Sequence, residues 1–260
     1  MTLRARADDA LRSSIPWPPD DTEESIVGSE LHQEAIWTLS FMLQRVAERR
    51  GEPWGVGTQL TLEGMTRRDG GVYKPMPDVL VMPRAFDKRR ATLSLRDDGI
   101  PLLLMEIASP STVGVDLDAK MDVYSRAGIH EYLVFDPTGE ELENGEQVRA
   151  WRLSDASPQG HGAFVPWQPN ASRRWYSDSL DLWFVPSGVL LNVLERDQRR
   201  VLSPLEESRA HAQTQARLSA AEARIADAEA RTHREAEARA ALEARLQRLL
   251  AQRDTPDGGL

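Results

Sequence analysis

The chain of 260 residues carries a formal net charge of −9 and contains no cysteine. Its length allows one well-buried domain and an appendage. The lack of thiols excludes disulfides, thiolate metal sites and a cysteine nucleophile, so any metal must be held by oxygen or imidazole ligands. The negative charge argues against a general nucleic-acid coating protein, because phosphate contacts supply most non-specific affinity. It does not exclude a nuclease.

The chain shows no secretory signal and no apolar run of membrane-spanning length, so we expect a cytoplasmic protein without a membrane partner. Residues 1–21 end in the proline-rich stretch IPWPPDD, which is typical of an extended arm. We expect a folded domain over residues 22–200, a helix over 205–253 and a disordered tail over 254–260.

Apolar residues recur at helical spacing between Ser29 and Arg49, and Ser29 is a suitable N-cap. This pattern predicts an amphipathic helix. Short runs at residues 57–62 and 78–82 predict strands.

The run PLLLMEI at residues 101–107 is apolar except for Glu106, as in a strand that is covered on both faces. Residues 116–127 predict a helix, which Gly128 would end, and residues 130–136 predict another strand. Strand, helix and strand in this order indicate a crossover between parallel strands.

After this crossover, short strands are predicted at residues 147–153, 164–167 and 180–185, in the style of a β meander. From about Leu205 the composition changes to Ala, Glu, Arg and Leu, without Gly or Pro until Pro256. This composition predicts a long helix.

The predicted helix has apolar residues at alternating spacings of three and four, which is typical of a coiled coil. Thr232, Glu235 and Arg239 interrupt this pattern, so a solvated single helix with many charge pairs is the alternative. The apolar positions are Leu218, Ala221, Ile225, Ala228, Leu242, Leu246 and Leu249.

Three residues could carry chemistry. Glu106 would be a buried carboxylate, which is costly unless it is paired or holds a metal, so its alternative role is a structural ion pair. Asp78 stands where an apolar strand begins and could instead be a turn residue. Lys120 would lie in the middle of the 116–127 helix, one turn before Tyr124, where a surface lysine is the ordinary alternative.

Two acids and one amine together form a sufficient hydrolytic set. Carboxylates on adjacent strands can share Mg²⁺ or Mn²⁺, a metal that polarises the scissile phosphate and lowers the pKa of its bound water. A nearby ammonium group can orient that water or stabilise the negative charge that develops on the phosphate.

Residues 22–140 closely resemble the Uma-two family of restriction-type endonucleases, which belongs to the PD-(D/E)XK nuclease superfamily. The resemblance lies in the order and spacing of Pro77-Asp78, the segment LLMEIASPST at 103–112, Asp116, Lys120, Tyr124, Ala127-Gly128, Glu131-Tyr132 and Asp136-Pro137.

The resemblance implies a restriction-endonuclease-like α/β fold, with a central mixed sheet flanked by helices and with Asp78 and Glu106 as metal ligands. In the superfamily's motif, a lysine follows the second acid by two residues. Ala108 occupies this position here, two residues after Glu106. Lys120 then resembles a migrated replacement that reaches the site from the helix.

Four further residues are possible accessories. Nucleases of this superfamily often carry a glutamate on the first helix, and Glu30 and Glu34 are the candidates. His32 lies beside them and resembles a position that is often histidine in the family, and Tyr124 belongs to the matching motif. Surface or packing roles are the alternatives for the residues of the first helix.

The leading hypothesis is a metal-dependent endonuclease that hydrolyses phosphodiester bonds in nucleic acid by activated-water attack, with DNA as the expected substrate. One alternative is a catalytically silent nuclease-fold module that acts in binding or assembly through its coiled-coil tail, which could also form a homodimer. Another is a non-catalytic α/β domain in which Glu106 is only ion-paired.

Overall fold

The computed structural model describes residues 30–154 and 162–253. The predicted arm at 1–21 and the predicted tail at 254–260 lie outside the described residues. The chain divides into two units, Met1–Pro204 and Leu205–Leu260. The second unit contains all but the first residue of the long helix α6, Pro204–Arg253. No described helix is long and apolar enough to cross a membrane.

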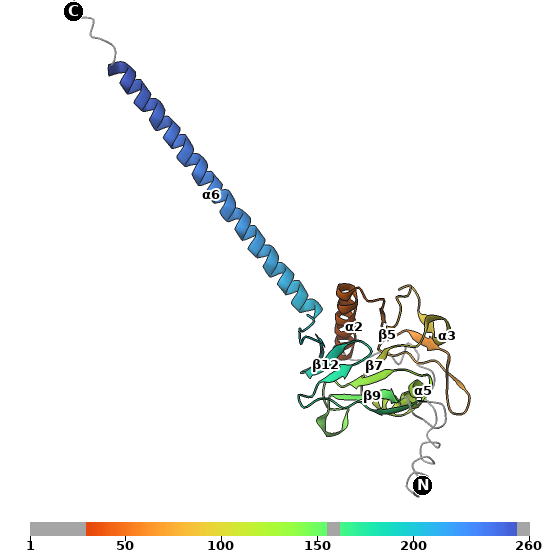
Figure 1. Ribbon diagram of the computed structural model, residues 1–260. Helices are drawn as coiled ribbons and strands as arrows, with labels where there is room; N and C mark the ends of the chain where they lie inside the picture. Colours follow the sequence, from red (N-terminus) through yellow and green to blue (C-terminus); the bar gives the residue numbers. More distant parts are fainter. Residues whose placement is uncertain (1–29, 155–161, 254–260) are drawn as a thin grey trace, which may run out of the picture. The chain divides into compact units, whose positions relative to one another are not determined.

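The first unit is built on a mixed sheet of six strands in the order β1-β5-β7-β8-β9-β10 (Figure 1). β7 and β8 are parallel, and every other neighbouring pair is antiparallel. This confirms the predicted fold class, a central mixed sheet with flanking helices. The strands are β1 Gly55–Gly57, β5 Val79–Met82, β7 Leu103–Ile107, β8 Glu131–Phe135, β9 Val148–Ser154 and β10 Ala163–Pro166.

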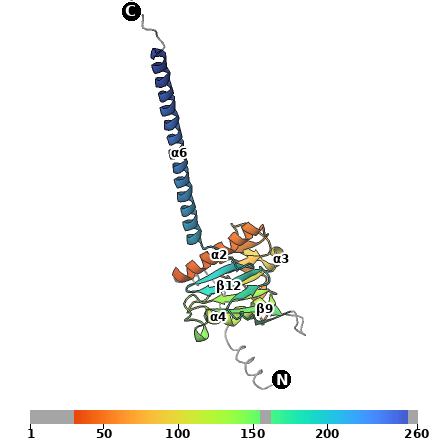
Figure 2. The same ribbon diagram turned by 60° about the vertical axis from the view of Figure 1, so that its left-hand side comes forward.

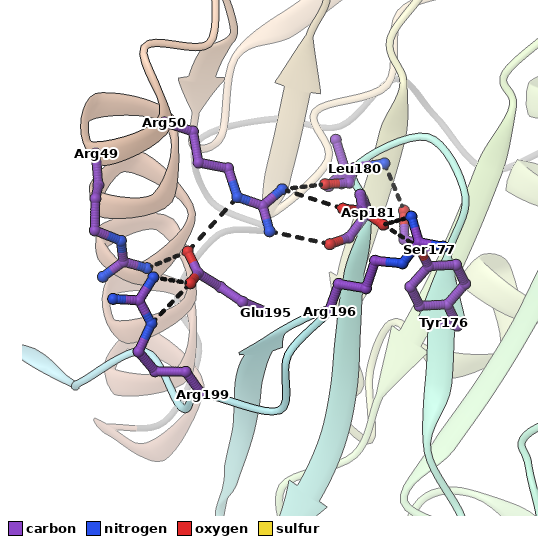
Figure 3. A network of polar contacts seen from close by, with 9 residues as sticks. All are labelled: Arg49, Arg50, Tyr176, Ser177, Leu180, Asp181, Glu195, Arg196 and Arg199. Atoms are coloured by element: carbon purple, nitrogen blue, oxygen red, sulfur yellow. Dashed lines mark hydrogen bonds and ion pairs between the residues drawn. The ribbon is translucent and has the colours of Figure 1, made fainter.

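One face of this sheet is covered by helix α2, Glu30–Arg50, and by a separate antiparallel sheet of three strands (Figure 2). The helix buries Leu39 and Leu43 against strand residues such as Val81 and Leu103, because helical spacing places its apolar residues on one side. The three strands are β11 Trp175–Ser177, β12 Leu182–Ser187 and β13 Leu190–Glu195. Arginines of α2 pair with Glu195 of β13 (Figure 3).

The opposite face carries the short helices α4, Val113–Leu117, and α5, Ala119–Arg126, and its core includes Leu80, Leu104 and Tyr124. Two small sheets complete this side of the unit. They pair β2 Thr61–Glu63 with β6 Thr92–Ser94, and β3 Met65–Thr66 with β4 Val72–Tyr73, while α3 Leu95–Asp98 follows β6 and the 3-10 turn η2 Glu143–Gly145 precedes β9.

Strand register explains how two distant acids meet. Val79 of β5 pairs with Met105 of β7 in antiparallel register, so the next pair along the ladder is Asp78 and Glu106. Side chains alternate between the two faces of a strand. Both acids therefore belong to the face that contains Leu80 and Leu104, beneath α5.

The prediction of one helix over residues 116–127 is wrong. The segment forms α4 and α5, because the backbone of Asp118 departs from helical geometry, with φ of −129° and ψ of −72°. Lys120 consequently lies in the first turn of α5 rather than in the middle of a helix. Asp116 and Lys120 stand on either side of the break, and both are buried.

The later strands are predicted only in part. The parallel pairing of β7 and β8 confirms the expected crossover. The predicted strand at 180–185 corresponds to β12, whereas β11 and β13 are not predicted. Strands β9 and β10 extend the central sheet instead of beginning a separate β meander.

Candidate active site

Asp78 and Glu106 form the centre of the site. The backbone N–H of Asp78 donates to Glu106 Oε2 at 3.3 Å, and the N–H of Ile107 donates to Asp78 Oδ2 at 2.8 Å. Each carboxylate is thus fixed by the backbone of the strand segment that carries the other. The Glu106 side chain is 3% exposed and that of Asp78 is 13% exposed, so Asp78 is the more accessible acid.

Lys120 reaches this pair from helix α5. Its Nζ lies 3.2 Å from Glu106 Oε1 and 3.2 Å from Asp116 Oδ1, and the side chain is buried. The Tyr124 hydroxyl, one turn further along α5, donates to Glu106 Oε1 at 2.9 Å. The structure therefore brings Asp78, Glu106, Lys120 and Tyr124 together, with the lysine supplied by a helix.

Asp116 is a member of this cluster that the site prediction omits, although the residue is part of the motif that resembles the family. Its side chain is 1% exposed, and burial raises the pKa of its carboxyl against the lowering effect of Lys120. Its backbone carbonyl accepts a hydrogen bond of 3.0 Å from the buried Tyr132 hydroxyl. The sequence signal is its spacing of four residues from Lys120, which would place both side chains on one face of the continuous helix that the sequence predicts.

His32 contacts the site from helix α2, with Nε2 at 3.3 Å from Asp78 Oδ2. Burial lowers its pKa, but the hydrogen bond and charge of Asp78, the backbone of Ile107 and the charge of Asp116 together raise that pKa above the ordinary value of 6.5. Glu30 and Glu34 lie on the exposed side of the same helix. Among the described residues, neither forms a hydrogen bond or ion pair with the site.

The same residues carry a family signature. The sequence model of the Uma2 family, described as "Putative restriction endonuclease", matches residues 22–166. This span is more than half of the chain and contains every residue of the site. The chain belongs to the Uma2 family. Membership of Uma2 supports a nuclease function.

No curated protein matches the chain. A crystal structure at 1.96 Å, titled as a putative nuclease belonging to DUF820 from Anabaena variabilis, is 17% identical, with a TM-score of 0.36. The match covers 63% of this chain and 85% of that chain.

The donor set of this Uma2 protein fits a hard divalent cation. Two carboxylates, Glu106 and Asp116, contact Lys120, and Asp78 lies beside Glu106. Among the described residues, Oδ1 of Asp78 receives no hydrogen bond, so this accessible acid has an oxygen available. Mg²⁺ is usually bound by one or two protein carboxylates, with water and substrate phosphates completing its shell. Among the described residues, no group of three or more acids and histidines has an arrangement that could itself hold a metal ion.

Proposed function

We propose that this protein is a metal-dependent endonuclease that hydrolyses phosphodiester bonds in DNA by attack of an activated water. The observation that carries the proposal is the pairing of Asp78 with Glu106 across two strands, with the buried ammonium of Lys120 3.2 Å from Glu106. The family's description as a restriction endonuclease supports DNA as the substrate.

Asp78 and Glu106 are the residues that would hold Mg²⁺ or Mn²⁺. The bound metal would polarise the scissile phosphate and lower the pKa of a coordinated water. Lys120 is the cationic group of the site. In this proposal its ammonium orients the attacking water or stabilises negative charge that develops on the phosphate.

The surrounding residues act on these three as positioning groups. Asp116 holds Lys120 through an ion pair of 3.2 Å, and Tyr124 holds Glu106 through a hydrogen bond of 2.9 Å. His32 and the Ile107 N–H both contact Oδ2 of Asp78, which orients this carboxylate and leaves Oδ1 directed elsewhere. Such prearranged contacts reduce the reorganisation that the reaction would otherwise need.

The test is a cleavage assay on supercoiled plasmid DNA with Mg²⁺, Mn²⁺ or EDTA, run in parallel on single-stranded DNA and RNA. The wild type should cleave DNA only with a divalent metal. Asp78→Asn should lower the rate by about 10³-fold, because it removes a metal-ligand charge and keeps the side chain's shape. Glu195→Gln is the matched control, since this buried acid lies in the Arg49 and Arg199 network. Cleavage that survives both EDTA and Asp78→Asn would contradict the proposal.

A second candidate function is a nuclease-fold module that binds or assembles without cleaving, as the long exposed helix α6 favours. This function predicts that the protein binds plasmid DNA or a second protein chain but does not nick the DNA with any divalent metal. The same plasmid assay, read for mobility shift as well as for nicking, separates the two candidates.

A further inference from the structure

Helix α6 carries apolar side chains that its own unit does not cover. Within the described residues, the helix spans 50 residues and every side chain from Ser208 to Leu250 is exposed. The exposed side chains include large aliphatic ones, which monomeric proteins rarely align in a long stripe. They are Leu218, Ile225, Leu242, Leu246, Leu249 and Leu250, each at least 50% exposed.

Most of these side chains occupy one heptad frame. Leu218, Ile225 and Leu246 fall at heptad position a, and Leu242 and Leu249 fall at position d, where two-stranded coiled coils place their buried residues. Ala221 and Ala228 fill the d positions beside the first two. The frame thus holds two apolar blocks, over 218–228 and 242–249, separated by the polar residues Thr232, Glu235 and Arg239.

The charges beside this apolar face are sorted by sign. Position g precedes each a residue and position e follows each d residue, so both flank the contact between two helices. In this helix the charged g residues are all arginine and the charged e residues are all glutamate. They are Arg217, Arg224, Arg231 and Arg245 at g, and Glu222, Glu229 and Glu243 at e.

This sorting distinguishes the two possible orientations of a pair of identical helices. In a parallel, in-register pair, a g residue lies beside the e residue five positions later in the second copy. Arg217 would then face Glu222 of the second copy. In an antiparallel pair, g faces g and e faces e, which would set arginine against arginine and glutamate against glutamate. Like charges at such positions act against the pairing.

We propose that α6 joins two copies of this chain through a parallel, in-register, two-stranded coiled coil. The occupant of the apolar stripe is therefore a second copy of the same helix. The proposal is independent of the proposed nuclease function, because it rests on residues of the second unit alone.

Contacts within the helix agree with this assignment. Among the described residues, Arg217, Glu222, Arg224 and Glu229 have no ion-pair partner in their own chain. Further along, Arg231 pairs with Asp227 at 2.6 Å and Arg239 pairs with Glu243 at 3.0 Å. The charges that would fix the orientation thus lie in the first apolar block, between residues 217 and 229.

A parallel pair has a consequence that follows from chain connectivity alone. Each Met1–Pro204 unit precedes its own helix. Two copies in parallel register would therefore carry both units at the same end of the coiled coil. If the unit is a nuclease, each particle would present two active sites.

The first experiment measures mass and orientation on the full-length protein. Light scattering after size exclusion should give about twice the chain mass of 29.1 kDa. Because the chain has no cysteine, Ala221→Cys at position d introduces a single thiol that should form an interchain disulfide under mild oxidation. Ala223→Cys, at the outward position f two residues later, is the matched control and should stay uncrosslinked.

The second experiment exchanges charges. Arg224→Glu alone and Glu229→Arg alone should each raise the dissociation constant of the dimer by about tenfold, because each converts both interchain pairs to like charges. The double variant should restore wild-type association. An equimolar mixture of the two single variants should form a heterodimer, since every pair is then of opposite sign.

Three outcomes would overturn the proposal. A monomeric mass at micromolar concentration would establish a solvated single helix. A dimer whose Ala221→Cys form does not crosslink would be antiparallel or out of register. Equal association of the single, double and mixed charge variants would remove the charge argument for the parallel orientation.

Discussion

The first unit buries two clusters of charge, and they differ in their balance of acid and base. At the candidate active site there are three acids and two bases: Glu106 and Asp116 contact Lys120, and Asp78 contacts His32. Between α2 and β13, Glu195 accepts from Arg49 at 2.5 Å and from Arg199 at 2.9 Å, and lies 3.5 Å from Arg50 (Figure 3). Arg50 and Arg196 also lie 3.9 Å and 3.8 Å from Asp181, so arginines outnumber acids in this cluster.

The difference in balance distinguishes the Glu195 network from the candidate active site. In the Glu195 cluster, the arginine contacts outweigh burial and lower the pKa of the carboxyl. At the site, burial outweighs Lys120 and raises the pKa of Asp116. Buried acids in excess of nearby bases are costly unless a further cation can join them. The site cluster thus has the composition expected for a metal centre, whereas the Glu195 cluster is neutralised by the chain itself.

The largest expected effect comes from removing one base from each cluster. Lys120→Met should lower the free energy of unfolding by about 3–5 kcal/mol, because two buried carboxylates lose their ammonium. Arg199→Met should cost less than about 1 kcal/mol, since its side chain is 57% exposed and Glu195 retains Arg49 and Arg50. Urea unfolding monitored by circular dichroism measures both. Equal losses of unfolding free energy in the two variants would show that the clusters do not differ in their balance of acids and bases.

The next effect concerns the stability of the Glu195 cluster and its dependence on pH. Glu195→Gln should lower the free energy of unfolding by roughly 1.5 kcal/mol at pH 7, because it weakens hydrogen bonds to a charged acceptor. Since the folded pKa of Glu195 is lowered, its contribution is complete above the unfolded value of about 4.5 and is lost as the pH falls through the folded pKa.

The stabilities of Glu195→Gln and wild type should therefore converge in acid, while DNA cleavage at pH 7 stays unchanged. Unfolding curves between pH 3 and pH 7 measure the convergence. A difference in stability that stays constant over this range would contradict the role of the ionised Glu195.

A smaller effect is expected inside the site. Tyr124→Phe removes the hydroxyl that donates to Glu106 Oε1 at 2.9 Å and keeps the ring against Tyr132. Because Glu106 then loses one of the contacts that orient it, cleavage should fall by about tenfold. The rate under saturating metal is the measurement, and an unchanged rate would remove Tyr124 from the positioning groups.

The smallest effect is expected on the exposed side of α2. Glu30→Gln and Glu34→Gln should each change cleavage by less than about twofold, because exposed substitutions away from the site have small effects. His32→Gln is the internal comparison on the same helix and should reduce cleavage, since His32 contacts Asp78 at 3.3 Å. If a glutamate variant loses as much activity as the His32 variant, that glutamate acts at the site and the prediction is wrong.

The sequence predicts the strands of the site well and its helix poorly. Glu106 could be singled out because it is the one polar residue in an apolar run, and β7 and β8 are parallel as predicted. The break at Asp118 could not be predicted, because the local pattern is continuous and only the backbone of that residue reveals it. Asp116 is absent from the predicted site although its spacing from Lys120 is visible in the sequence, because its burial depends on how α4 and α5 pack.

The network of Glu195 shows a second limit of sequence reasoning. β13 alternates buried and partly exposed residues, and Glu195 occupies a position in the inward series after Leu191 and Val193. Its arginine partners Arg49 and Arg50 lie in α2, far away along the chain. A pairing between such distant residues follows from the tertiary fold and leaves no local pattern.

The most direct test of the central claim is metal binding by wild type and Asp78→Asn, measured by calorimetric titration and by the shift in melting temperature with Mn²⁺ or Mg²⁺. Ligands that bind only the folded state raise its melting temperature. The wild type and Glu195→Gln should bind the metal and melt at higher temperature with it. Asp78→Asn should lose both responses, while its melting temperature without metal stays at or above the wild-type value. Equal metal responses in Asp78→Asn and wild type would contradict the assignment of Asp78 and Glu106 as the metal centre.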